Sequence, residues 1–209
     1  SAKTFLGLTI PENTSAEDSI TLALDRLMSV ESVGPFLSRQ LIQRFTTSNP
    51  SAGYISRVTQ VFNNGRYSLP NGTVVGGGLR GDLKATIAAI LLDRENLQPE
   101  APNTFGKLRE PVLRFTQWPR AFNAGAITPE YTVELYDLSS VSIYGQGLAQ
   151  HPFRAPSVFN FYRPGYVPPG TDSGAAGMTV PELQILTTET IPAYMNFITF
   201  FAMANTQYA

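Results

Sequence analysis

Apolar residues at helical spacing, separated by strong helix breaks, limit the folds open to this chain more than any other feature. Gly34-Pro35 and Asn49-Pro50 interrupt its N-terminal third, and proline is tolerated in the first turn of a helix but not in its interior. Each interval between the breaks has an apolar stripe with the 3.6-residue period. The stripes are Ile20, Leu24, Leu27 and Met28; Leu37, Leu41, Ile42 and Phe45; and Tyr54, Val58, Val61 and Phe62. The sequence therefore predicts three consecutive helices.

Short polar motifs mark where these helices begin and end. Thr14 and Glu17 have the spacing of a capping box ahead of the first stripe. Asn63-Asn64-Gly65 is a stop signal after the third stripe. Asp82 is placed to cap a fourth helix, whose stripe is Leu83, Ile87, Ile90 and Leu91.

The second half of the chain is also predicted to be helical, with one long interruption. A helix is expected from about Lys107 to Phe122, where Pro119 should kink or end it. Another is expected from Thr128 toward Leu138, and one or two more between Pro181 and about Asn205. The segment between Gly145 and Gly177 is rich in proline and aromatic residues. We expect it to be held against the body of the protein, because disordered linkers lack aromatic residues.

Residues 66 to 80 break the helical pattern. Asn71-Gly72 and Gly76-Gly77-Gly78 occur there, and such pairs favour turns. No Gly-Lys-Ser/Thr follows the glycines, so a phosphate-binding loop is not expected. The predicted fold class is therefore mainly α, a multi-helix orthogonal bundle with long Pro/Gly/aromatic-rich loops and at most a minor β-hairpin.

Composition excludes several classes of function. The formal net charge is -1, so no global basic field favours nucleic acid as a partner. No apolar run is long enough to cross a bilayer, and no transmembrane segment is expected. The absence of cysteine rules out disulfides, thiolate metal sites and cysteine nucleophiles. No cofactor or metal is predicted, since neither the EF-hand nor the His-Glu-x-x-His pattern occurs.

Cationic side chains are the strongest candidates for binding. Arginine forks suit sulfate, phosphate or carboxylate groups. The candidates for binding an anion or a partner are Arg39, Arg44, Lys107, Arg109, Arg114 and His151. On a helix Glu110 would lie four residues before Arg114, a spacing that favours an ion pair. The favoured alternative is therefore structural, in which these arginines pair with carboxylates and helix ends to orient packed helices.

Catalytic and metal-binding groups are sparse. His151 is the single histidine, and Ser157 and Asp172 share its Pro-rich loop without a nucleophile elbow. A hydrogen-bonded structural histidine is therefore favoured over a catalytic triad. Asp93 and Glu95 are the only close acidic pair near a helix end, where we expect a solvated terminus.

Five ordered blocks of sequence resemble the family called domain of unknown function 1800. They are Arg39–Phe45 with Thr47–Pro50, Leu79–Ala85 with Ala89–Asp93, Gly106–Arg114, Ala155–Tyr162 and Pro181–Leu186. Each block alone would be weak, but their order along nearly the whole chain is specific. The Gly76–Gly78 region and Pro119 depart modestly from the pattern.

The resemblance implies a location but no chemistry. Family members are typically bacterial and exported, which implies a periplasmic or extracellular protein, and their genes often neighbour those of sulfatase-like exported proteins. No catalytic residues are established for the family, so none is carried over. Members are roughly twice as long as this chain. Residues 1–209 therefore resemble the C-terminal portion of one larger helical domain, with the N-terminal half absent from this chain.

Two classes of function follow as hypotheses. One is a non-catalytic scaffold or binding partner of another protein, or of the N-terminal half of the same protein. The other is a hydrolase whose catalytic groups lie mainly in that half, possibly acting with a sulfatase-like partner. Sparse charge and wide apolar faces also predict a large exposed apolar patch, or one buried by a second chain. The candidates for it are Phe159, Phe161, Phe197, Phe200 and Phe201.

Overall fold

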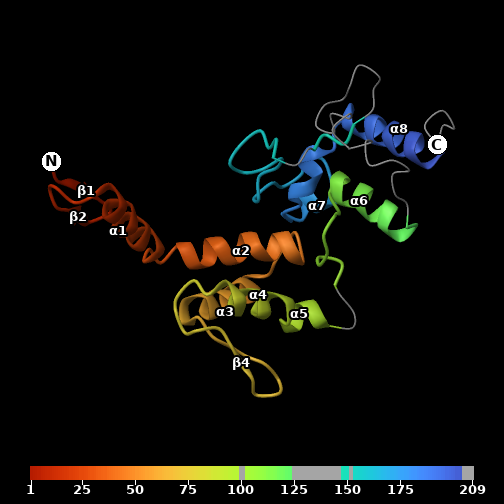
Figure 1. Cartoon of the computed structure of the whole chain (residues 1–209). Coiled ribbons are helices and arrows are strands. Elements are labelled where there is room, and N and C mark those ends of the chain that lie inside the picture. The colour runs from red at the N-terminus through yellow and green to blue at the C-terminus, as the bar shows by residue number, and fades with distance from the viewer. Residues whose placement is uncertain (99–101, 124–146, 151–152, 204–209) are drawn as a thin grey trace. The chain divides into compact units, whose positions relative to one another are not determined.

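A computed structural model describes residues 1–98, 102–123, 147–150 and 153–203 (Figure 1). The chain divides into two compact units, Ser1–Phe105 and Gly106–Ala209, and each is considered by itself. In the described ranges helices dominate, and the strands form two antiparallel two-stranded sheets. The predicted mainly α fold class is confirmed.

The first unit begins with a small hairpin that the sequence did not predict. Strands β1 (Lys3–Phe5) and β2 (Leu8–Ile10) pair through a two-residue turn. Leu6 and Gly7 in this turn have φ angles of 46° and 75°. Positive φ at both positions matches the twist of a hairpin. Strands this short show no usable alternation of apolar and polar residues.

Helix α1 (Ala16–Met28) begins one residue later than the predicted capping box requires. Ser15 is the N-cap, and its Oγ accepts a hydrogen bond from Asp18 N at 3.0 Å. The Asp18 carboxylate in turn accepts a bond from Ser15 Oγ at 2.8 Å. The capping box at Thr14 and Glu17 was therefore wrong by one residue. The Thr14 hydroxyl instead donates to Pro11 O at 2.8 Å.

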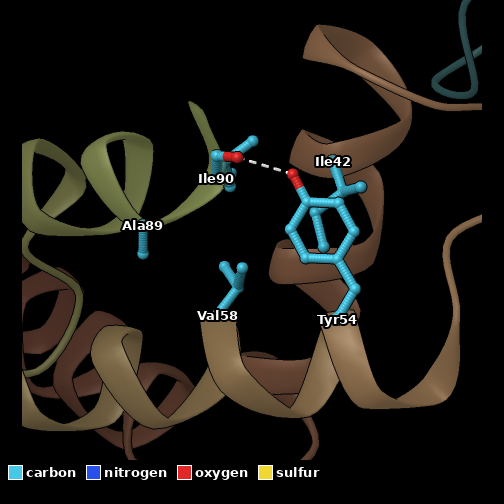
Figure 2. Packing of buried hydrophobic residues seen from close by; sticks show 5 residues of the cluster. All are labelled: Ile42, Tyr54, Val58, Ala89 and Ile90. Atoms are coloured by element: carbon cyan, nitrogen blue, oxygen red, sulfur yellow. Dashed lines mark hydrogen bonds between the residues drawn. The ribbon is translucent and has the colours of Figure 1, made fainter. Parts of the chain in front are cut away.

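Three helices form the core of this unit. They are α2 (Val33–Phe45), α3 (Ala52–Asn64) and α4 (Leu83–Leu91), and their starts and stops follow the predicted breaks. The buried cluster consists of Ile42, Tyr54, Val58, Ala89 and Ile90 (Figure 2). Tyr54 Oη donates to Ile90 O at 2.6 Å, so the hydroxyl group of this buried side chain is hydrogen-bonded. Burial raises the pKa of Tyr54 to about 12.

The link from α3 to α4 contains the predicted hairpin. Strands β3 (Tyr67–Ser68) and β4 (Val74–Val75) pair antiparallel. Gly65 ends α3 with a φ of 64°, and a Cβ there would lie 2.1 Å from Leu79 O. Only glycine fits this position, because it tolerates both the left-handed backbone and the close approach. A short helix, α5 (Arg94–Leu97), follows α4.

In the second unit, α6 (Pro111–Ala121) starts four residues later than predicted. Glu110 precedes a proline and is extended, with φ −60° and ψ 149°, because the proline ring disfavours helical geometry in the residue before it. Lys107 therefore lies outside the helix. Pro119 lies within α6, which continues to Ala121.

The other described helices of the second unit are α7 (Asp172–Ala175), the 3-10 helix η2 (Pro181–Ile185) and α8 (Thr190–Ala202). Helix α8 packs on α6. Phe115, Leu148 and Phe197 are buried together. The Phe115 and Phe197 rings meet edge to face, with centroids 5.0 Å apart. The helix predicted from Thr128 toward Leu138 lies outside the described residues.

Several hydrogen bonds of the described residues hold the Pro-rich loop to its unit, as expected. Tyr162 Oη donates to Glu110 Oε1 at 2.5 Å. Arg163 N donates to Gln184 Oε1 at 2.8 Å, and Val180 N donates to Tyr166 O at 2.9 Å. Over the residues that the structure describes, no helix has the length and apolarity needed to span a membrane.

Candidate functional site

The apolar stripe of α1 faces solvent. Ile20, Leu24 and Leu27 are 61%, 56% and 45% exposed, and Ser19 is the buried residue of this helix. Their i, i+4, i+7 spacing places them on one side of the helix. A stripe with the pattern of a core-facing helix is therefore not covered by the first unit itself.

The segment that carries this face is acidic. Residues 1–32 hold five carboxylates, those of Glu12, Glu17, Asp18, Asp25 and Glu31, against Lys3 and Arg26, a formal side-chain charge of −3. Glu17, Asp18 and Asp25 on α1 itself are exposed. The Arg26 side chain is engaged in the unit, because its Nε donates to Leu6 O at 2.7 Å. The apolar stripe therefore belongs to a segment with an excess of acidic side chains.

Arg80 fixes the C-terminal end of α1. Its Nε donates to Met28 O at 2.8 Å and its Nη2 to Val30 O at 3.0 Å. Its Nη1 also donates to Asn63 Oδ1, and its guanidinium lies 5.3 Å from the centre of the Phe62 ring. One side chain thus ties the carbonyl groups after α1 to helix α3, so the exposed stripe is presented on an anchored helix.

A pocket of about 320 Å³ lies between α3 and α4. Val58, Val61, Ala89 and Leu92 contribute apolar walls, and Arg57 and Asp93 contribute charge. Arg57 donates from Nε and Nη2 to both oxygens of Asp93 at 2.8 Å. It also donates to Glu95 Oε1 at 2.7 Å. The hydrogen bonds to Asp93, followed by those to Glu95, raise the pKa of Arg57.

The sequence interpretation missed this cluster. It placed Asp93 and Glu95 at a solvated helix end, but Asp93 is only 7% exposed and Arg57 neutralises it. Their partner lies 36 residues earlier in the chain, so no local spacing could indicate the pair. Since Asp93 also accepts a bond from Glu95 N at 2.9 Å and caps α5, the cluster mainly fixes α5 against α3.

The second unit contains a buried charged network. Lys107 Nζ lies 2.6 Å from Glu182 Oε1 and 3.9 Å from Glu110 Oε1. Glu110 and Glu182 are 4% and 2% exposed. Gln150 Nε2 donates to Glu110 Oε2 at 2.7 Å, and Gln150 Oε1 accepts from Val112 N at 3.1 Å. The network thus joins the start of α6, residue 150 and η2, and its polar groups are turned inward.

The predicted ion pair between Glu110 and Arg114 is wrong. Glu110 bonds to Tyr162 and Gln150, whereas the Arg114 guanidinium lies 4.3 Å from the centre of the Tyr194 ring. A cation over an aromatic face is a favourable arrangement. The pair fails because Glu110 precedes the helix instead of lying on it.

The predicted binding residues do not gather in one place. Arg39 and Arg44 are exposed on α2, five positions apart, so they point to different sides of the helix. Arg109 is exposed just before α6, while Lys107 and Arg114 are engaged as described above. His151 lies outside the described residues. Within the ranges that the structure covers, no group of three or more His, Cys, Asp or Glu side chains could hold a metal ion.

Comparison with known proteins identifies the family of the chain. The family model described as "Protein of unknown function (DUF1800)" matches residues 1–206. No curated protein and no solved structure matches. The resemblance seen in the five sequence blocks is therefore confirmed over nearly the whole chain.

Proposed function

The chain belongs to the DUF1800 family, and we propose that it is an exported, non-catalytic scaffold that binds a protein partner through the exposed face of α1. Export rests on the family resemblance alone. The observation that supports the binding role is the solvent-facing stripe of Ile20, Leu24 and Leu27. Contiguous exposed apolar surface on a soluble protein marks an interaction site.

The chemistry of the face defines the partner. Anchors at i, i+4 and i+7 are the pattern by which one amphipathic helix packs against another apolar surface. A side-chain charge of −3 over residues 1–32 favours basic groups around that surface. The partner is therefore a protein segment with an apolar stripe flanked by lysine or arginine, supplied by another exported protein or by the N-terminal half of a longer chain.

The contacts of the buried acids support a non-catalytic role. Glu110 and Glu182 are the most enclosed carboxylates among the described residues of the second unit, and both are bonded to neighbouring side chains. Such a network orients segments and offers no free base to a substrate. The alternative is a hydrolase whose catalytic groups lie in an N-terminal half. The bonded carboxylates of Glu110 and Glu182 do not support it.

Site-specific photo-crosslinking tests the proposal. A photoreactive phenylalanine analogue at Leu24 should yield a discrete crosslinked protein in cells that export the intact gene product. The matched control places the analogue at Asp25, which is exposed on the other side of the same helix. Equal crosslinking from both positions, or none from Leu24, would sink the proposal. Fractionation of the same cells checks export, because a protein found only in the cytoplasm contradicts it.

A further inference from the structure

A loop in the second unit combines apolar and cationic residues in a way that the scaffold proposal does not use. Residues 153–163 contain Phe153, which is fully exposed, Val158 at 95% and Phe159 at 50% exposure. These three side chains are called the loop tip. Figure 1 shows this part of the chain, in cyan, projecting from the body of its unit. The tip is therefore apolar and open to solvent.

The tip is held in a defined shape. Asn160 N donates to Ser157 O at 3.0 Å, and the two residues form a β-bridge, so Val158 and Phe159 occupy the centre of a tight turn. Ser157 Oγ also accepts from Phe159 N at 3.1 Å. The bonds of Tyr162 to Glu110 and of Arg163 to Gln184 fix the base of the loop. A tip ordered in advance loses little conformational entropy on binding.

The charged residues that flank the tip in the sequence are both arginines. No Asp or Glu occurs between Asp137 and Asp172, whereas Arg154 and Arg163 flank the tip and are exposed. The whole chain has a net charge of -1, so this loop is cationic in a slightly acidic protein.

We propose that the loop docks on an anionic lipid bilayer, with the tip in the headgroup region and the two arginines on lipid phosphates. Apolar side chains enter the boundary between headgroups and acyl chains, while neighbouring cations bind anionic lipids. Guanidinium groups suit phosphate oxygens. Two cations are too few for binding to nucleic acid, which depends on many phosphate contacts.

Vesicle co-sedimentation of the full chain tests this proposal. Binding is expected to vesicles of phosphatidylcholine mixed with phosphatidylglycerol, to be weak on phosphatidylcholine alone, and to fall with added salt. Val158→Asp with Phe159→Asp should weaken binding at least about tenfold, because the apolar insertion is lost. Arg154→Gln with Arg163→Gln should reduce binding to the anionic vesicles and leave binding to phosphatidylcholine unchanged. Val74→Asp, a charge placed on an exposed residue of β4, is the control and should bind as the parent does.

A second measurement separates insertion from simple adsorption. Phe159→Trp should shift its fluorescence to shorter wavelength with anionic vesicles, relative to the parent chain with its single Trp118. Circular dichroism checks that each variant is folded. Absence of binding to anionic vesicles, or equal binding by the tip variant, would overturn the proposal. Capture of a protein by the parent and not by the tip variant, without vesicle binding, would overturn it in favour of a protein partner. None of these outcomes involves α1. The lipid-binding proposal is therefore tested independently of the scaffold function.

Discussion

At the scale of single residues, Asp82 shows how one side chain serves two segments. Its Oδ1 accepts from Ala85 N at 3.0 Å, which caps α4, and its Oδ2 accepts from Gly77 N at 2.7 Å, which holds the glycine-rich turn. Both hydrogen bonds, first that from Ala85 N and then that from Gly77 N, stabilise the charged carboxylate. The pKa of Asp82 is therefore lowered from its ordinary value of 3.8.

This lowered pKa predicts a loss of stability in acid. Because the folded pKa lies below the unfolded one, the contribution of Asp82 is complete above the unfolded pKa and is lost as pH falls through the folded value. The free energy of unfolding, measured with urea, should fall less between about pH 6 and about pH 3 in Asp82→Asn than in the parent. Asparagine keeps the helix cap but does not titrate. An unchanged pH dependence in this variant would contradict the assignment.

The buried network of the second unit gives a prediction at the same scale. Lys107→Met should destabilise the fold by about 3–5 kcal/mol, because Glu110 and Glu182 are then buried without their cation. Arg109→Met is the matched control, since Arg109 is exposed, and should change stability by less than about 0.5 kcal/mol. Chemical unfolding of both variants measures the difference. A similar small loss of stability in the two variants would show that Lys107 does not neutralise Glu110 and Glu182.

At the scale of secondary structure, α1 depends on Arg80 more than on its own packing. The helix exposes its apolar stripe. Arg80 donates hydrogen bonds to the carbonyl groups of Met28, the last residue of the helix, and of Val30, which follows it. Arg80 belongs to one of the sequence blocks that resemble the family, as do Gly81 and Asp82. The structure gives this block a physical role, because the three residues join the end of α1, the end of α3 and the start of α4.

Removal of this arginine should loosen α1 locally. Arg80→Ala leaves the carbonyl groups of Met28 and Val30 without these bonds, at a cost of about 1–3 kcal/mol. Hydrogen exchange of amides in α1 should become faster, while exchange near Tyr54 and Val58 in the α3 core should change little. Arg94→Ala, at an exposed arginine, provides the comparison. Equal acceleration throughout the unit would mean that Arg80 stabilises the core and not α1 in particular.

Local sequence signals predicted the elements well where they depend on neighbouring residues. Pro35 lies in the first turn of α2, Gly65 is the C-cap of α3, and Asp82 is the N-cap of α4, so these local signals were close to the helix ends. The predicted start of α6 was wrong because Pro111 keeps the residue before it out of helical geometry, whatever the helical spacing from Lys107. The Glu110–Arg114 pair then failed with it.

At the scale of the whole molecule, the sequence could not show what covers a helix. The stripe of α1 has the same spacing as that of α3, yet α3 is buried and α1 is exposed. Of the predicted apolar patch, Phe159 is exposed and Phe197 is buried, while the side chains of Phe200 and Phe201 are not described. Arg57 and Asp93 lie 36 residues apart and meet through packing of α3 on α4. Such contacts depend on tertiary structure and leave no local pattern. That residues 1–209 form part of one larger domain stays a prediction.

The hydrogen bond between Tyr162 and Glu110 connects the projecting loop with the interior of its unit. A phenol and a carboxylate removed from water each depend on the other, since loss of one partner leaves a buried polar group unsatisfied. Glu110 in turn holds Gln150, which holds the first turn of α6. The presentation of the loop and the start of that helix therefore share one interior contact. Evolution cannot adjust the surface of this loop freely: Tyr162 and Glu110 should be retained together or replaced together.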